Sequence, residues 1–396
     1  MTTTSDATWL RRVLHNETVG GAIMLAAAAI GLLCANSALS DWYSSLTSTT
    51  FGISALHLEL TAAQWAADLL LALFFLVAGA ELKHELTSGS LSSARTAVVP
   101  VVGALGGMAT SIAMYVVVTG LLGASSDIRS GWAIPSSTDI AFALAVLAIG
   151  GRGLNPTVRI LLLSIAVVND VGSILIIAFA FASGFDAIYF ALALACVGAW
   201  LLLQRQGVRF GPAYLPVFLL GWYFMHASGV HATIAGMAFG LATSARHGRL
   251  GSSGIDQVDR ALRPWVAGLA VPMFAFLAAG VRVIGTDTGG TSVALSAISS
   301  PLTLGIVAGL VIGQPLGVSM GCWVARRFLR GETEARSGEL RVVAALAGVG
   351  FTVALLVSDL TFISEPELLD QAKVGILVAS IAASLLAAIT MRTARR

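Results

Sequence analysis

Residues 133–143 read AIPSSTDIAFA, a stretch that is apolar at both ends and polar at its centre. Pro135 has no backbone N–H, and the hydroxyl residues that follow it, ending at Thr138, can bond backbone groups that an interrupted helix leaves without partners. The stretch predicts a membrane helix broken at Asp139. Helix ends and carbonyls would then be exposed at mid-membrane, where a bare cation can be coordinated or balanced. The alternative is a Pro-kinked helix that Asp139 merely caps.

The composition on either side of this stretch is that of a membrane protein. Of the 396 residues, 57% are hydrophobic and only 11% are charged, whereas roughly 25% are charged in an average soluble domain. Most of the chain must therefore face lipid or its own interior. No basic run suggests nucleic acid. The three cysteines, at positions 34, 196 and 322, lack metal-ligand or redox spacing, so no resident cofactor is expected.

Apolar runs of about 20 residues predict roughly twelve membrane spans in an all-α protein. The first 16 residues are expected to form a tail, residues 17–391 a single transmembrane domain, and residues 392–396 a second tail. The expected spans are 17–36, 63–81, 97–120, 130–150, 157–181, 185–203, 211–225, 229–244, 263–281, 301–323, 341–360 and 371–391.

The positive charges predict the orientation of these spans. An even number of spans places both tails on one side of the membrane. Only Arg129, Arg282 and Lys373 then fall on the other side, and every remaining lysine and arginine falls on the side of the tails. Because cytoplasmic loops are enriched in Lys and Arg, both termini are predicted to be cytoplasmic. The expected location is the bacterial cytoplasmic membrane.

The outer loop at about residues 45–60 contains TTFGISALHLEL (49–60), in which apolar residues alternate around a potential turn near Ser54. This pattern is compatible with a β-hairpin or with an irregular loop.

Asp170 lies in SIAVVNDVGSILIIA (164–178), deep inside an otherwise apolar span. No Arg or Lys lies within one helical turn of it in sequence, so a local salt bridge cannot explain its burial. A carboxylate there must bind a cation, reach a water cavity or hold a proton. Competition between a cation and a proton for one carboxylate is the core of an antiport mechanism; a purely structural aspartate is the alternative. Its neighbour Asn169 points about 100° away along the helix and need not share the same cavity.

A second helix break is predicted in AGVGFTVALL (347–356), where Gly348 and Gly350 precede Thr352. Close packing of small residues between helices is the alternative. The two breaks lie in the fourth and eleventh spans. Spans 3–5 and 10–12 would then correspond with opposite topology, which is the inverted-repeat pattern of secondary transporters.

Charged and titratable residues gather where the second span is expected to meet the cytoplasm, in AELKHEL (80–86): Glu81, Lys83, His84 and Glu85. Asp259 lies at the cytoplasmic approach to the ninth span. Such charges can couple their protonation and sense pH, or they can be solvated helix ends. His231 is a weaker candidate for a pH sensor, the alternative being a hydrogen-bonded histidine at a helix end.

Several long motifs, in matching order, resemble the NhaA sodium/proton antiporters, and the similarity runs from about residue 17 to 391. They are FFLVAGAELKHELTSGSL (74–91), GWAIPSSTDIAFALAVLA (131–148), SGVHATIAG (228–236), PWVAGLAVPMFAFLAAGV (264–281) and AGVGFT (347–352). The resemblance implies twelve spans, with the fourth and eleventh broken and crossing, and inverted repeats of which this family is a standard example. It also implies a homodimer, joined partly through an outer hairpin. The activity it implies is exchange of intracellular sodium or lithium for external protons, serving pH and sodium homeostasis by alternating access.

The resemblance also implies roles for particular residues. Asp170 would be the principal ion-binding carboxylate and the ligand of the transported Na+. Thr138 and Asp139 would lie at the helix crossing, and Asp68 matches an acid of the family. The residues that match the family's pH-sensing cluster are Glu81, Glu85 and Asp259, with Lys83 and His84 at its basic positions.

The chain departs from the family at two positions. Where the family typically has two adjacent aspartates, this chain has Asn169-Asp170, and where it has a lysine in IGKPLG, this chain reads IGQPLG with Gln314. The family's aspartate and lysine are thought to pair, and one of them left alone would be an uncompensated buried charge costing about 3–5 kcal/mol. Two amides can instead hydrogen-bond across the gap. The change affects the expected proton count and raises the prospect of electroneutral exchange.

Two other functions compete with cation/proton exchange. One is transport of a different solute by the same fold, such as an organic anion together with sodium. The other is an intramembrane aspartyl protease in which Asp139 and Asp170 activate water. Proteases of that kind pair Tyr-Asp with Gly-x-Gly-Asp, whereas here Thr138 and Asn169 precede the aspartates.

Overall fold

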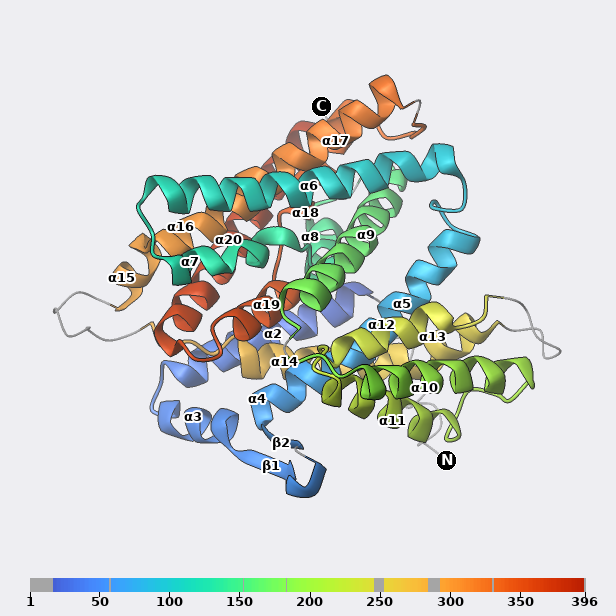
Figure 1. Ribbon diagram of the computed structural model, residues 1–396. Helices are drawn as coiled ribbons and strands as arrows, with labels where there is room; N and C mark the ends of the chain where they lie inside the picture. Colours follow the sequence, from blue (N-terminus) through green and yellow to red (C-terminus); the bar gives the residue numbers. More distant parts are fainter. Residues whose placement is uncertain are drawn as a thin grey trace, which may run out of the picture. The chain divides into compact units, whose positions relative to one another are not determined.

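The computed structural model describes residues 17–56, 58–151, 153–182, 184–245, 253–283, 293–329 and 331–394, and these are almost entirely helical (Figure 1). Within these residues, nine helices are long and apolar enough to cross a membrane, or ten if one strongly bent pair counts as a span. The all-α polytopic fold is thus confirmed. The number twelve remains a prediction, because the expected spans 211–225 and 229–244 form the shorter helices α11 (Tyr214–Ala227) and α12 (Thr233–Ala242).

The chain divides into two compact units, and each is described by itself. The first unit comprises Leu39–Gly89 and Ile176–Ala278 together with the segment that ends at Cys34. Besides α11 and α12 its elements are α2 (Glu17–Ala35), α3 (Ser40–Ser48), β1 (Thr50–Ile53), η1 (Ser54–Leu56), β2 (Leu58–Thr61), α4 (Ala62–Trp65), η2 (Ala66–Leu70), α5 (Leu71–Thr87), α10 (Ala187–Arg205), α13 (Gly254–Trp265), η4 (Val266–Ala270) and α14 (Val271–Ala278). Here η2 and η4 are π-helical turns that continue the helices on either side.

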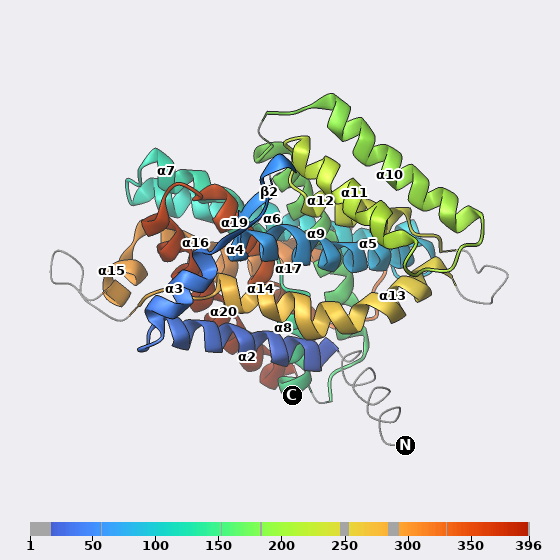
Figure 2. The ribbon, with the colours of Figure 1, turned by 90° about the horizontal axis from the view of Figure 1, so that it is seen from below.

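Close contact between backbones joins α5 to α12 in the first unit. A Cβ atom on Gly236 would lie 2.0 Å from Ala72 O, and one on Gly240 would lie 2.3 Å from Leu76 O. Only glycine allows this approach, which is a common device of membrane helix packing. The helices α10 and α11 also lie side by side in both views (Figures 1 and 2).

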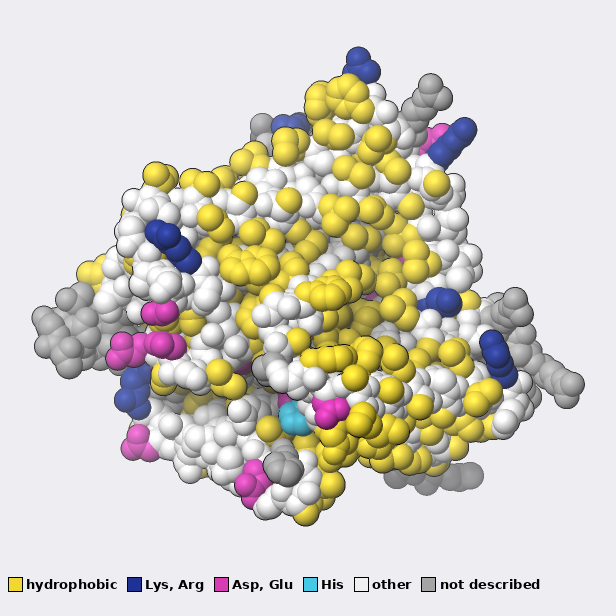
Figure 3. All heavy atoms as spheres, viewed as in Figure 1, with side chains coloured by type: hydrophobic (Ala, Val, Ile, Leu, Met, Phe, Trp, Pro, Cys, Tyr) yellow, Lys and Arg dark blue, Asp and Glu magenta, His cyan; other side chains and the backbone are white. Residues whose placement is uncertain are grey.

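The exposed face of α10 is hydrophobic, as Figure 3 shows. Its exposed side chains include Ile188, Leu192, Leu194 and Leu202. A helix that presents large apolar side chains along its outer face suits a lipid environment.

Of the two alternatives left open for the outer loop, the structure has the hairpin. Strands β1 and β2 pair antiparallel, with Thr50 opposite Thr61 and Ile53 opposite Leu58. Gly52 has φ of 150°, and a Cβ there would lie 1.7 Å from Leu58 O, so glycine is required at this position. The strand side chains Phe51 and Ile53 are exposed.

The second unit comprises Ser90–Leu175 and Ala279–Arg396, with the short piece Ala35–Ala38. Its elements are α6 (Ala94–Leu121), α7 (Ser126–Ser130), η3 (Gly131–Ser136), α8 (Ile140–Gly150), α9 (Thr157–Ala180, up to Leu175 in this unit), α15 (Val293–Ser299), α16 (Pro301–Val307), η5 (Ala308–Gly313), α17 (Gln314–Phe328), α18 (Ser337–Ala347), α19 (Thr352–Thr361) and α20 (Pro366–Ala394). Here η3 is a 3-10 helix and η5 is a π-helical turn.

Small residues also bring α6 against α17 (Figure 1). A Cβ on Gly317 would lie 2.1 Å from Gly106 O, and one on Gly321 would lie 2.3 Å from Val102 O. The π-helical turn η5 comes just before Pro315, which lacks the N–H that an α-helix would donate to the carbonyl of residue 311. Gln314 therefore begins α17 directly after a widened turn.

Both predicted helix breaks are present, and each lies between two unbroken long helices. The helix η3 ends at Ser136 and α8 begins at Ile140, with a bend of 56° between the helices on the two sides. Likewise α18 ends at Ala347 and α19 begins at Thr352. The first break stands between α6 and α9, and the second between α17 and α20. This repeated order is the predicted inverted-repeat fold.

Candidate functional site

The two helix breaks contact each other directly. The backbone N–H of Asp139 donates to Val349 O at 2.7 Å. Gly350 allows the approach, because a Cβ there would lie 2.6 Å from Ser137 O. Backbone groups that each broken helix leaves unbonded are thus partly satisfied by the other break.

Asp139 caps both helices that start at the crossing. Its Oδ1 accepts from the backbone N–H of Phe142 at 2.9 Å, at the start of α8. Its Oδ2 accepts from the backbone N–H of Thr352 at 3.0 Å, at the start of α19. Helix N-termini carry partial positive charge and unbonded N–H groups. Asp139 therefore caps helices at a helix break and not within one kinked helix, and its buried carboxylate lies at two positive helix ends.

Thr138 is the centre of a buried polar network. Its hydroxyl donates to Ala347 O in the second break at 2.6 Å. The same Oγ1 accepts from Asn169 Nδ2 at 2.9 Å and from Gln314 Nε2 at 3.4 Å. Residues from η3–α8, α9, α17 and α18 therefore meet at one hydroxyl. The direct amide–amide hydrogen bond expected between Asn169 and Gln314 is replaced by this shared contact with Thr138.

Asp170 is buried in α9, one residue after Asn169, with 2% of its surface exposed. Asn169 itself points to the helix crossing, a direction that its sequence position alone could not predict. Within the described part of the chain, no group of three His, Cys, Asp or Glu side chains is arranged to hold a metal ion.

The predicted charge cluster is organised by a residue that the sequence reading missed, Arg263. Its guanidinium forms ion pairs with Glu81 in α5 and with Asp259 one turn earlier in α13. The i,i+4 spacing between Asp259 and Arg263 could have predicted their ion pair from the sequence. The ion pair between Arg263 and Glu81 could not be predicted in this way. Nearby in α5, His84 is exposed and Lys83 and Glu85 are half-buried.

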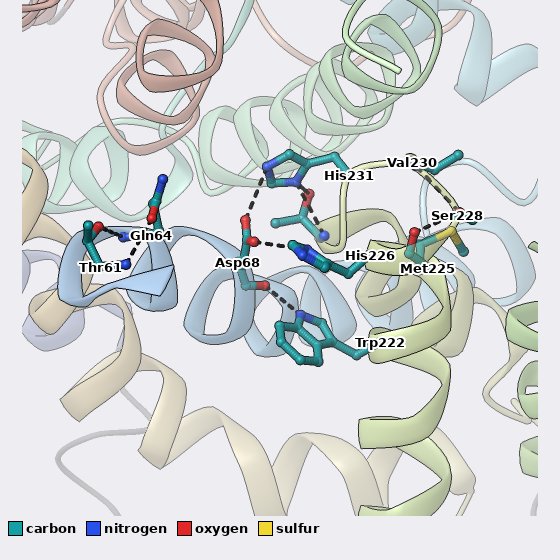
Figure 4. A network of polar contacts seen from close by, with 10 residues as sticks. Thr61, Gln64, Asp68, Trp222, Met225, His226, Ser228, Val230 and His231 are labelled. Atoms are coloured by element: carbon teal, nitrogen blue, oxygen red, sulfur yellow. Dashed lines mark hydrogen bonds and ion pairs between the residues drawn. The ribbon is translucent and has the colours of Figure 1, made fainter. Parts of the chain in front are cut away.

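Asp68 and His231, predicted separately, lie in one network together with His226 (Figure 4). Asp68 stands on the π-helical turn η2, with its carboxylate 3.3 Å from His226 Nδ1 and 3.3 Å from His231 Nε2. The backbone N–H of Thr233 donates to His231 Nδ1 at 3.4 Å, and the Thr233 hydroxyl lies 2.8 Å from the same nitrogen. His231 is thus a hydrogen-bonded residue at the start of α12. His226 was missed because nothing in the sequence links it to Asp68.

Apolar membrane-length helices, two of them broken and bonded to each other at the breaks, define a secondary active transporter and not an enzyme. The family model for Na+/H+ antiporter 1 matches residues 11–391. The chain therefore belongs to the NhaA family of Na+/H+ antiporters, as its motifs predicted.

Relatives and a solved structure agree with this assignment. The Na(+)/H(+) antiporter NhaA of Streptomyces antibioticus is 43% identical over 392 residues, which cover 98% of this chain and 80% of the relative. The Na(+)/H(+) antiporter NhaA of Cutibacterium acnes is 43% identical over 387 residues, covering 96% of this chain and 87% of the relative. The fold is similar to that of the sodium proton antiporter MjNhaP1 of Methanocaldococcus jannaschii, with a TM-score of 0.57 at 17% identity, covering 98% of this chain and 100% of that one.

Proposed function

We propose that this protein exchanges sodium or lithium for protons across the bacterial cytoplasmic membrane, with both termini in the cytoplasm. The observation that carries the proposal is Asp170, a carboxylate buried in α9 beside the crossing of two broken helices. A buried carboxylate binds either a proton or a cation. Because the two ligands exclude each other at one site, inward movement of one can drive outward movement of the other.

The residues at and beside the helix crossing would have different roles in transport. Asp170 binds the transported ion or a proton in turn, as the site opens to one side of the membrane and then to the other. Asp139 balances the two helix ends and need not touch the ion, since both of its oxygens accept backbone N–H groups. Thr138 holds Asn169 and Gln314 in place. Neither amide carries a proton that can be exchanged, so we propose one proton per sodium ion.

Control by pH would rest on the two charged networks of the first unit. One is built on Glu81, Asp259 and Arg263, with Lys83, His84 and Glu85 on the same helix as Glu81. The other is the contact of Asp68 with His226 and His231. Gain or loss of a proton by an imidazole or a carboxylate would change the balance of charge within either network.

We propose a homodimer as the assembled form, with membrane lipids around it. The hairpin of β1 and β2 supports a role in this contact, because Phe51 and Ile53 are 53% and 57% exposed. Exposed apolar strand residues suit contact with another protein surface. Cross-linking of a cysteine placed at position 51, compared with one placed at exposed position 127, tests this assembly in native membranes.

The exchange is tested with purified protein in proteoliposomes. A sodium gradient should drive proton movement in the opposite direction, read with a pH-sensitive dye trapped inside. Protein-free vesicles and a choline gradient provide the controls. Proton movement that requires an added organic anion, or no proton movement with sodium or lithium, would refute cation/proton exchange.

A further inference from the structure

The two amides beside the helix crossing are each satisfied at one end only. Asn169 and Gln314 are fully buried, with 0% exposure. Their nitrogens donate to Thr138, but among the described residues Asn169 Oδ1 and Gln314 Oε1 have no hydrogen-bond partner. Buried polar groups in proteins are normally bonded, so two such acceptors in one network require a reason.

The orientation of both amides follows from Thr138. A threonine hydroxyl has one proton to donate and two lone pairs with which to accept. Its proton goes to Ala347 O, so Oγ1 can only accept from the amides. Asn169 and Gln314 must each turn the NH2 group to Thr138 and the oxygen away from it. Reversing either amide would lose a hydrogen bond, so the two oxygens are held unsatisfied by the network itself.

The carboxylate of Asp170 is buried one residue further along the same helix as Asn169. Asn169 precedes Asp170 in α9, and both amide groups are within one hydrogen bond of the same hydroxyl. Next to that hydroxyl in the chain, Ser137 Oγ is also buried without a partner among the described residues. Hard cations are bound by carboxylate, amide and hydroxyl oxygens. A lysine at position 314 has no acceptor and could not act in this way.

We propose that Asn169 Oδ1 and Gln314 Oε1 coordinate the transported cation together with Asp170, which makes Gln314 a ligand of the ion. This inference rests on the proposed cation/proton exchange and names further ligands of its site. Cation binding would satisfy the two oxygens that have no hydrogen-bond partner among the described residues. The amides would then contribute to sodium affinity while Asp170 alone exchanges the proton.

The variant Gln314→Met tests the ligand, because methionine has a similar length and no acceptor oxygen. The sodium dissociation constant is measured on the purified full-length protein from the sodium-dependent rise in Tm, at fixed pH with choline keeping the ionic strength constant. We expect binding about tenfold weaker than in the wild type. In the absence of sodium, Tm should be equal to or above that of the wild type, since the unsatisfied acceptor is gone.

Two further variants separate coordination from packing. Thr303→Val removes a buried hydroxyl that donates to Gln371 O elsewhere in the second unit; its Tm should fall while its sodium affinity stays unchanged. Gln314→Glu keeps an oxygen at the same position and should bind sodium at high pH. A dissociation constant for Gln314→Met within twofold of the wild type, or equal losses in the Met and Glu variants, would overturn the proposal. Failure of the wild type to exchange sodium for protons would instead refute the proposed function.

Discussion

Asp170 is the residue on which the proposed exchange depends most directly. It is buried in α9 beside the crossing, and asparagine in its place could neither release a proton nor supply a charge to a cation. We expect Asp170→Asn to abolish sodium-driven proton movement, measured by dequenching of a pH-sensitive dye in everted membrane vesicles. Asp186→Asn is the matched control, because Asp186 caps α10 in the first unit and asparagine is an equally good cap. A wild-type response from Asp170→Asn would refute the mechanism.

Asp139 should tune sodium affinity more than it enables turnover. In Asp139→Asn the buried charge is lost, and only one oxygen remains to accept the two backbone N–H groups of Phe142 and Thr352. We expect the apparent KM for sodium to rise roughly tenfold, about 1.4 kcal/mol, while residual exchange persists. Dye dequenching over a series of sodium concentrations measures this. An unchanged sodium dependence would leave Asp139 as a helix cap and nothing more.

For single residues, the sequence predicted the chemical role of a side chain better than it predicted which side chains lie in contact. A lone carboxylate in an apolar span is informative by itself, because its burial needs compensation. The meeting of side chains at Thr138 could not be predicted from the sequence, since Asn169 and Gln314 lie 31 and 176 positions away from it along the chain. Arg263 and Glu81 are separated by 182 positions. Such contacts depend on how helices pack, which no local pattern records.

Among the elements, the two broken helices show why some features were predictable. Pro135 and the glycines at 348 and 350 act on the backbone locally, through a missing N–H or a missing side chain, so their effect is visible in sequence. The π-helical turns η2, η4 and η5 were not predicted. The shortness of α11 and α12 was missed as well, because hydropathy measures apolar character and not where a helix ends.

The contact between the two breaks requires a glycine at position 350. A Cβ there would lie 2.6 Å from Ser137 O, so Gly350→Ala must push the breaks apart. We expect a loss of stability of about 1–3 kcal/mol and a large loss of exchange, measured as Tm of the purified protein and as dye dequenching in vesicles. Gly120→Ala in α6 meets open space and serves as the control. Equal activity in the two alanine variants would contradict a role for this close contact.

For the molecule as a whole, the family fold must be reconciled with the two amides, Asn169 and Gln314, at the transport site. The family model matches residues 11–391 and both helix breaks are present, yet the chain has two amides where the resemblance implies a pair of charged residues. The structure makes this replacement coherent, since Thr138 accepts a hydrogen bond from each amide and neither position is left with an uncompensated charge. The fold is therefore preserved while the number of ionisable groups at the site is reduced.

The smaller number of ionisable groups predicts electroneutral exchange. A site with two adjacent aspartates and a lysine can release two protons as one sodium ion binds, and such transport moves net charge. Here Asn169 and Gln314 do not titrate, and Asp170 is the ionisable group left at those three positions. Asp139 is committed to two backbone N–H groups and carries no exchanged proton in this scheme. One proton traded for one sodium ion moves no charge.

The membrane potential, worth about 2.3 kcal/mol per charge per 100 mV, should therefore leave the exchange rate unchanged. The measurement is sodium efflux from proteoliposomes in which valinomycin and potassium clamp the potential while the pH gradient is held constant. The double variant Asn169→Asp with Gln314→Lys introduces the charged pair. Its exchange rate should depend on the membrane potential, unlike that of the wild type. A wild-type rate that climbs as the potential is varied would show net charge movement and refute the one-for-one exchange.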